Sequence, residues 1–247
     1  MRLGALLAHP SAGPPEPVAP WARRLVDAGF ESLWTPQVIG RGALVPDPFV
    51  TLAVAATATE GVELGTSTLQ VPLHHPVDLA QRILSLASVC GERLSIGLSP
   101  GSTQDDFLAL DRDHATRFTT FGRSVARLRG LLIDGRDEQV VLAPAGIRAP
   151  LLLGSWGANV ERAAGDFDGW LASAFRRTPE EILEAHDRYR EAGGRRAVVL
   201  GIAVRTLDDL RPAAVTLARY ARAGVDDAVV VLDTDGPEPE RVRDLVG

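Results

Sequence analysis

Short apolar runs alternate along the chain with longer segments in which apolar residues recur at helical spacing. Eight of the runs have the continuous apolar character of strands that are buried on both faces. Their starts lie 30, 31, 30, 58, 18, 28 and 30 residues apart, and a strand, a crossover helix and a second parallel strand together need about 30 residues. The predicted strands begin near Arg2, Ser32, Glu63, Arg93, Leu151, Gly169, Ala197 and Asp227.

The intervening segments carry signals for helix starts and ends. Pro76 stands in a first-turn position, apolar residues follow it at helical spacing, and Gly91 can end that helix. Thr178 and Glu181 form the pattern of a capping box before a helix over residues 182–192. Further helices are predicted over residues 118–132, 159–164 and 237–246.

Eight parallel strands with crossover helices close most economically into a (β/α)8 TIM barrel with short insertions, and an open doubly wound sheet is the alternative. The longest gap between strands can hold a helix and an excursion over residues 134–150. No linker rich in Pro, Gly or Ser divides the chain, so we expect a single domain over residues 1–247.

Composition narrows the possible functions. The 247 residues carry a net charge of -6 and no basic run with aromatic residues, which argues against nucleic-acid binding. Cys90 is the only cysteine, so the sequence has no internal disulfide or CxxC motif and suits the cytoplasm. Apolar runs are too short for a membrane span or a signal peptide. All 26 basic residues are arginine, which excludes Schiff-base, pyridoxal-phosphate and Walker-A chemistry because each needs a lysine.

The carboxyl ends of the predicted strands, where such barrels place their chemistry, are rich in Gly, Ser and Thr. The loops at residues 99–102 and 154–157 can bring backbone N–H groups to a phosphate, or they are simply tight turns. The five histidines lack metal-ligand spacing, and His74-His75 fits packing or capping better than ligation. The pairs Asp105-Asp106 and Asp233/Asp235 are a minor alternative as a magnesium or acid/base site, since loop aspartates mostly form solvated turns.

Two stretches, LGTSTLQVPLHHPV at residues 64–77 and GERLSIGLSPGS at residues 91–102, resemble the luciferase-like monooxygenase family. Further matches lie at residues 28–34, 117–118, 168–171 and 175–194, and all the matching segments come in the family's order along the chain. The resemblance implies a barrel that binds FMN or the deazaflavin coenzyme F420 at the strand ends, with a cis peptide bond between Ser67 and Thr68 under the ring. The resemblance also implies a set of residues near the cofactor's tail or ring. These are Ser99, Gly101, Ser102, Arg117, Gly154, Ser155, Trp156, Gly157 and Ala158.

The segment Trp34-Thr35-Pro36-Gln37 lacks the acidic residue and histidine that many members carry there. It resembles a branch of F420-dependent oxidoreductases, which favours F420 over FMN. Gln37 can donate and accept hydrogen bonds but transfers no proton at neutral pH, so His9 becomes the candidate acid. Trp34 and Trp156 either flank the ring or pack.

The resemblance therefore implies an oxidoreductase that moves a hydride between F420 and a small organic substrate. The alternatives are an FMN-dependent monooxygenase that uses reduced flavin and O₂ with a separate flavin reductase, and a non-catalytic flavin-binding barrel. The partners expected are a small-molecule substrate and a flavin or F420 reductase. A homodimer is expected from the resemblance, and no metal, nucleic-acid or membrane partner is expected.

Overall fold

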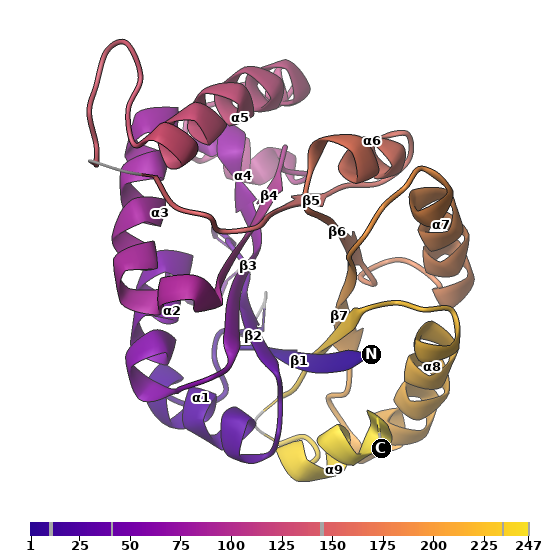
Figure 1. Cartoon of the computed structure of the whole chain (residues 1–247). Coiled ribbons are helices and arrows are strands. Elements are labelled where there is room, and N and C mark those ends of the chain that lie inside the picture. The colour runs from indigo at the N-terminus through magenta and orange to yellow at the C-terminus, as the bar shows by residue number, and fades with distance from the viewer. Residues whose placement is uncertain (10–11, 41, 144–145, 234, 247) are drawn as a thin grey trace.

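The computed structural model describes residues 1–9, 12–40, 42–143, 146–233 and 235–246. Eight parallel strands form a closed barrel in sequence order, and helices surround them (Figure 1). The last strand, β8, pairs with β1. The predicted closed barrel is confirmed, and the open sheet is not formed. The strands are β1 (Arg2–Leu6), β2 (Ser32–Thr35), β3 (Glu63–Gln70), β4 (Leu94–Ser99), β5 (Leu151–Gly154), β6 (Gly169–Ser173), β7 (Ala197–Ala203) and β8 (Asp227–Val231).

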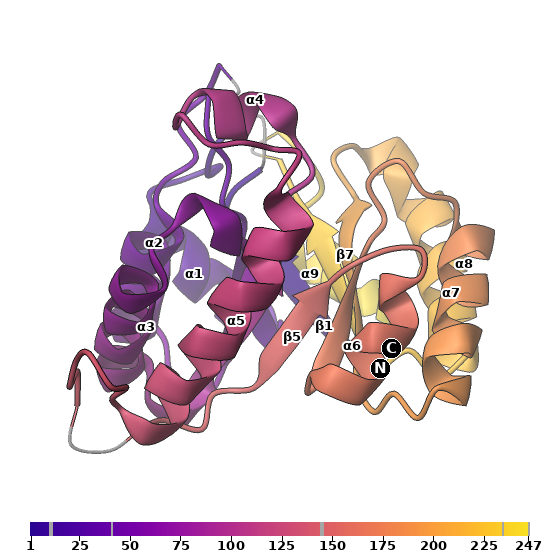
Figure 2. The ribbon, with the colours of Figure 1, turned by 90° about the horizontal axis from the view of Figure 1, so that it is seen from above.

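Helices surround the barrel, and the short α4 lies at one end of it, above the start of α5 (Figure 2). Thr178 and Glu181 form the predicted capping box at the start of α7, and Gly91 caps α3 with a φ of 61°. The helix predicted over residues 237–246 is shorter: α9 ends at Arg243 and a 3-10 turn follows. The helices are α1 (Val18–Asp27), α2 (Pro48–Ala58), α3 (Pro76–Cys90), α4 (Gln104–Leu108), α5 (Arg117–Asp134), α6 (Asn159–Asp166), α7 (Pro179–Glu191), α8 (Leu210–Arg222) and α9 (Pro239–Arg243).

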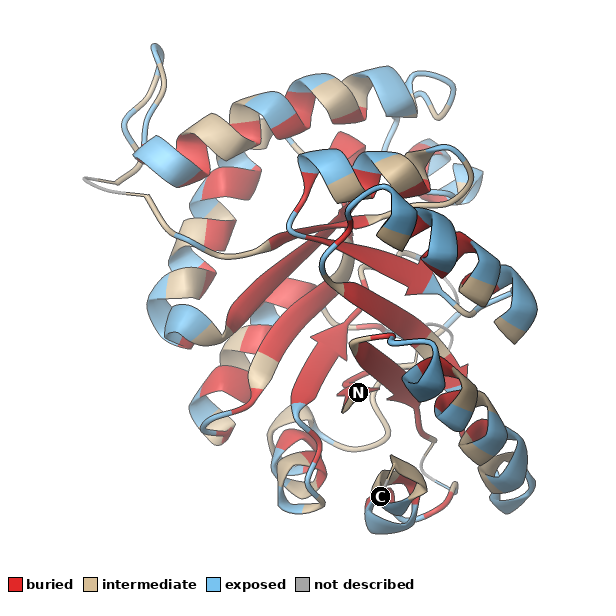
Figure 3. Cartoon of the chain, turned by 45° about the vertical axis from the view of Figure 1, so that its right-hand side comes forward, coloured by how far each residue is buried: buried red, intermediate tan, exposed pale blue. Residues whose placement is uncertain are grey.

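The strands are buried on both faces (Figure 3), because one face packs against the helices and the other fills the barrel. Trp34 belongs to the interior cluster and is 0% exposed, and its Nε1 donates to Ser32 Oγ over 2.9 Å. A Cβ at Gly65 would lie 2.2 Å from Trp34 Cε3, so only glycine leaves room for the indole. Of the two interpretations of Trp34, packing is the one that the structure shows.

A partly buried ion-pair network closes the end of the barrel at which the strands begin. Arg196 donates to both carboxylate oxygens of Glu63 over 2.9 Å and to Asp227 over 2.9 Å. Arg2 pairs with the same two carboxylates. Burial alone would raise the pKa of Glu63, but Arg196, Ser95 and Arg2 hold that pKa below its usual value. This end of a barrel serves stability rather than chemistry.

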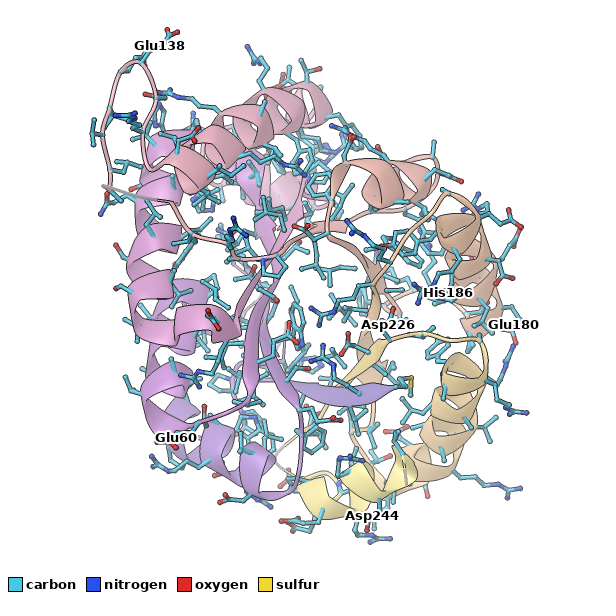
Figure 4. All side chains as sticks on the ribbon, in the orientation of Figure 1. Glu60, Glu138, Glu180, His186, Asp226 and Asp244 are labelled. Atoms are coloured by element: carbon cyan, nitrogen blue, oxygen red, sulfur yellow. The ribbon has the colours of Figure 1, made fainter. Side chains whose placement is uncertain are left out.

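The labelled carboxylates Glu60, Glu138, Glu180 and Asp244 point outward from the periphery of the barrel (Figure 4). Within the described ranges, no three His, Cys, Asp or Glu side chains come together as a metal site would require. In the same part of the chain, none of the helices combines the length and the apolar character that a membrane crossing needs.

Candidate functional site

The carboxyl ends of β3 and β4 bring together predicted site residues from two segments of the chain, residues 67–68 and residues 99–101. Gln70 and Ser99 are partners in the strand register, and the peptide bond between Ser67 and Thr68 is cis, as the resemblance implied. Thr68 Oγ1 donates to Ser99 Oγ over 2.6 Å, and the Gly101 N–H reaches the same Ser99 oxygen at 3.4 Å. These contacts place four of the predicted residues in one cluster.

Two glycines let backbone segments approach this cluster. A Cβ at Gly154, the last residue of β5, would lie 2.6 Å from Thr68 Cγ2 and 3.5 Å from Ser99 Cβ. Gly101 has a φ of 79°, and a Cβ there would lie 2.7 Å from Gln70 Oε1. Any side chain at either position would push into the cluster, so the ends of β3, β4 and β5 can meet only because these residues are glycine.

Ser67 supplies an unsatisfied polar atom at this point. Its Oγ is buried and has no hydrogen-bond partner among the described residues. Buried hydroxyl groups are normally hydrogen-bonded, so this atom calls for an outside partner. The polar edge of a flavin or deazaflavin ring carries carbonyl and N–H groups that can pair with a hydroxyl. The residues present therefore fit such a ring.

The loop after β5 is stabilised by its own contacts. Ser155 Oγ donates to the Asn159 carbonyl over 2.9 Å, so this hydroxyl is engaged within the loop. Gly157 has a φ of 64°, and Ala158 is exposed. The loop leads into α6. Its role toward the cofactor stays a prediction, and that role would depend on backbone N–H groups rather than on the Ser155 hydroxyl.

Trp156 lies in the same loop and is half-buried. Its ring centre is 6.5 Å from that of Trp170, and the Arg177 guanidinium lies 4.4 Å from its centroid. These contacts show that Trp156 packs within the protein on at least part of its surface. A role beside the ring stays a prediction.

Two further predicted residues lie outside the cluster. Arg117 starts α5, donates to the His114 carbonyl over 3.0 Å, and makes no hydrogen bond with the cluster in the described parts of the chain. Its Nε is buried without a partner there, so this arginine keeps donor capacity for an anion. Ser102 is exposed beside Gly101. Their roles toward a phosphate stay predictions.

Gln37, after β2, is part of a polar network that the sequence did not reveal. Gln37 Oε1 accepts from the Gln70 backbone N–H over 2.7 Å, and Gln37 Nε2 lies 2.8 Å from His74 Nε2. Gln70 Nε2 in turn donates to Asp106 Oδ2 over 2.7 Å. The available signals were a glutamine at the end of a buried strand and the His74-His75 pair. Of that pair, His75 has the expected capping role at the start of α3, where its side chain accepts from the Val77 N–H.

His74 and His9 are both shifted toward the neutral form. Burial, with help from Arg82, lowers the pKa of His74 to about 4. Burial also lowers the pKa of His9, Arg205 adds to this effect, and Asp233 opposes it. At neutral pH His9 is therefore mostly unprotonated, and this state suits a proton acceptor better than a proton donor. Arg205 and Asp233 form an ion pair of 2.6 Å near it.

Comparison with known proteins agrees with this architecture. The family model described as luciferase-like monooxygenase matches residues 2–235. 4-Hydroxyprotoasukamycin monooxygenase of Streptomyces nodosus subsp. asukaensis is 33% identical over 94 residues, which are 37% of this chain and 25% of the relative. A provisionally named coenzyme F420-dependent oxidoreductase of Mycobacterium tuberculosis is 33% identical over 195 residues, 69% of this chain and 55% of the relative. The chain thus spans between a quarter and about half of these curated relatives.

Solved structures share the fold at low identity. The coenzyme F420 dependent tetrahydromethanopterin reductase of Methanopyrus kandleri aligns with a TM-score of 0.73 and 16% identity over 99% of this chain and 96% of its own. The oxygenating constituent of 3,6-diketocamphane monooxygenase from Pseudomonas putida, solved with FMN, has a TM-score of 0.68 and 15% identity over 90% and 74%. The resemblance of residues 64–77 and 91–102 is confirmed: the chain belongs to the luciferase-like monooxygenase family.

Proposed function

We propose that this chain is an oxidoreductase that binds coenzyme F420 over Ser67 and Thr68 and uses it for hydride transfer with a small organic substrate. The observation that carries the proposal is the buried Ser67 hydroxyl, which has no partner among the described residues. It lies in the Ser–Thr–Gly cluster at the carboxyl ends of β3, β4 and β5. A ligand with a polar ring edge would satisfy that hydroxyl.

The protein's part in such a reaction is to bind and orient. When bound, F420 supplies a ring carbon that accepts or gives a hydride. Thr68 and Ser99, held together by their hydrogen bond, would keep the floor of the ring site in one arrangement. The backbone around Gly101 and the loop at residues 154–158 would hold the anionic tail, with Arg117 as the candidate cation.

His9 and Gln37 follow neighbouring strands, because Leu6 pairs with Trp34 in the register of β1 and β2. His9, unprotonated at neutral pH, would accept the proton of a substrate hydroxyl while the carbon that carries this hydroxyl gives up its hydride. Gln37 would orient the substrate by hydrogen bonding, since its amide does not titrate.

The choice of F420 over FMN has two supports. The relative that aligns over 69% of this chain is provisionally named an F420-dependent oxidoreductase, and the segment at residues 34–37 resembles that branch. The second candidate is an FMN-dependent monooxygenase with a separate flavin reductase, which the match to a Streptomyces monooxygenase favours. Both functions would use the same cluster.

A paired titration of the purified protein with F420 and with FMN tests the proposal. A ligand that binds only the native state adds about 2.7 kcal/mol of stability at 100 times its Kd, which a melting curve resolves. A selective response to F420 supports the proposal. A selective response to FMN overturns it in favour of the monooxygenase, and no response to either cofactor overturns both. F420 binding without turnover across a broad panel of alcohols and ketones would point to a non-catalytic barrel.

A further inference from the structure

The Gln37 side chain is held in one orientation. Its Oε1 lies 2.7 Å from the backbone nitrogen of Gln70, which is a donor under all conditions. The opposite amide orientation would set two N–H donors against each other at that contact. Nε2 is therefore the Gln37 atom that faces His74 at 2.8 Å.

This orientation also determines the tautomer of His74. Gln37 Nε2 carries only donor hydrogens, so His74 Nε2 must accept, and the imidazole proton then resides on Nδ1. Three charged groups act on this ring: Arg82 and Asp78 from α3, and Asp47 at the start of α2. Arg82 is paired with Asp47 over 2.6 Å. The ring therefore stays neutral above about pH 5, and protonation of Nε2 would break its contact with Gln37.

Gln70 and Asp106 support the arrangement from the other side. Both are almost fully buried, at 6% and 2% exposure. Gln70 Nε2 donates to Asp106 Oδ2 over 2.7 Å and approaches the Gln37 carbonyl at 3.4 Å. Because Asp106 belongs to α4, this contact ties α4 to the ends of β2 and β3.

One N–H of the Gln37 side-chain amide has no hydrogen-bond acceptor among the described residues. Nε2 has two N–H groups, one of which faces His74, and the other has no acceptor within the described part of the chain. We propose that Gln70, His74 and Asp106 are positioning residues that hold this second N–H as an oriented donor for a neutral acceptor oxygen of the substrate, such as a carbonyl. This inference rests on the proposed function, because it assigns the substrate class of that site.

The alternative is that the network only joins α4 and the strand ends. An oriented donor is distinguished by its effect on one class of ligand. A carbonyl compound should bind through Gln37, whereas a cyclic ammonium ion of the same shape has no acceptor and should not. If the network is purely structural, His74→Phe and Asp106→Leu should leave the affinity for the carbonyl compound unchanged.

The first measurement is ¹⁵N NMR of the protein itself. We expect the Nδ1–H tautomer of His74 from pH 5 to pH 9 and two well-separated Gln37 amide protons. In His74→Phe the two protons should move toward the values of a freely rotating amide. His75→Phe is the matched control, because it makes the same change at the helix cap next door. An Nε2–H tautomer of His74 in the native protein would overturn the proposal.

The second measurement is a titration of the F420-loaded protein with cyclohexanone and with cyclohexylammonium, following the Gln37 amide signals. Cyclohexanone alone should shift them. The affinity for cyclohexanone should fall about tenfold in His74→Phe and in Asp106→Leu, which corresponds to about 1.4 kcal/mol. Asp106→Asn should restore it, since its amide oxygen can still accept from Gln70. The Kd for F420 should change less than threefold in every variant.

The outcomes separate the two proposals. If F420 binds and cyclohexanone leaves the Gln37 signals unmoved, the oriented-donor proposal fails while the proposed function stands. If Asp106→Leu and His74→Phe retain the native affinity for cyclohexanone, the network has only a structural role. If F420 does not bind to the native protein, the proposed function fails, and the same titration run without cofactor still decides whether Gln37 responds to a carbonyl.

Discussion

Thr68 donates a hydrogen bond from Oγ1 to Ser99 Oγ over 2.6 Å, and this bond joins the end of β3 to the end of β4. The Gly101 N–H points at the same serine oxygen from the following loop. A hydroxyl that accepts from two segments is a strong constraint on the shape of the strand ends. The ring site we propose depends on that shape.

Replacing Thr68 by valine tests this constraint, because the side chain keeps its shape and loses its donor. Thr68→Val should lower the free energy of unfolding by about 1 kcal/mol, the usual net value of a neutral hydrogen bond. It should also weaken F420 binding about fivefold, since the floor of the site is no longer held. Chemical denaturation and a fluorescence titration measure the two effects. Unchanged affinity would show that this bond does not shape the cofactor site.

Ser67→Ala should separate binding from stability. The Ser67 hydroxyl has no partner in the described part of the chain, so its removal should leave the free energy of unfolding within about 0.5 kcal/mol or raise it. The affinity for F420 should fall about tenfold, because the ring loses a hydrogen bond. A loss of stability together with full affinity would mean that the hydroxyl serves the fold instead.

Gly154→Ala should destabilise the protein, whereas alanine at an open glycine position should not. The new Cβ would lie 2.6 Å from Thr68 Cγ2, and overpacking of this kind costs about 1–3 kcal/mol. Gly165→Ala in α6 is the control: a Cβ there meets nothing within 4 Å, and it should stabilise the helix by about 0.5–1 kcal/mol. Thermal melts of both variants check the contrast. Equal melting temperatures would contradict the close approach of β3 and β5.

The ion pairs at the amino ends of the strands should control acid stability. Arg196→Leu leaves Glu63 and Asp227 with Arg2 as their partner. The free energy of unfolding should therefore fall by about 3–5 kcal/mol. Because the folded pKa of Glu63 lies below 4.5, its contribution is present above about pH 4.5 and disappears as the pH falls through the folded pKa.

The native protein should therefore lose stability more steeply below pH 4.5 than Arg196→Leu does. Urea denaturation between pH 3 and pH 7 measures both curves. Cofactor affinity at pH 7 should be unchanged in the variant, because these residues lie at the end of the barrel opposite the cluster. Parallel acid limbs for the two proteins would show that this network does not set the acid stability.

His9 should titrate below its ordinary value of 6.5, because burial disfavours the imidazolium. Asp233→Asn should lower the midpoint further, since the carboxylate stabilises the charged ring, and Arg205→Gln should raise it. NMR titration of the histidine Cε1 protons follows each change. A midpoint above 6.5 in the native protein would restore His9 as the candidate acid.

Much of the architecture follows from local pattern. The spacing of the apolar runs predicted all eight strands, and the Thr178 cap and Gly91 predicted helix ends that the structure shows. The same strand order predicts that Ser67, Thr68 and Ser99 lie at one end of the barrel, and the register of β3 and β4 agrees. These features are predictable because backbone conformation and strand polarity depend on neighbouring residues.

Tertiary structure alone decided which polar groups meet. Asp106 bonds to Gln70 across 36 positions, and Arg196 bonds to Glu63 across 133. The sequence left Trp34 open between flanking the ring and packing. In the structure it fills the barrel interior, because Gly65 on the neighbouring strand leaves space for it. Such pairings depend on strand register and barrel closure, which bring distant side chains together. The periodicity of apolar residues along the chain does not predict them.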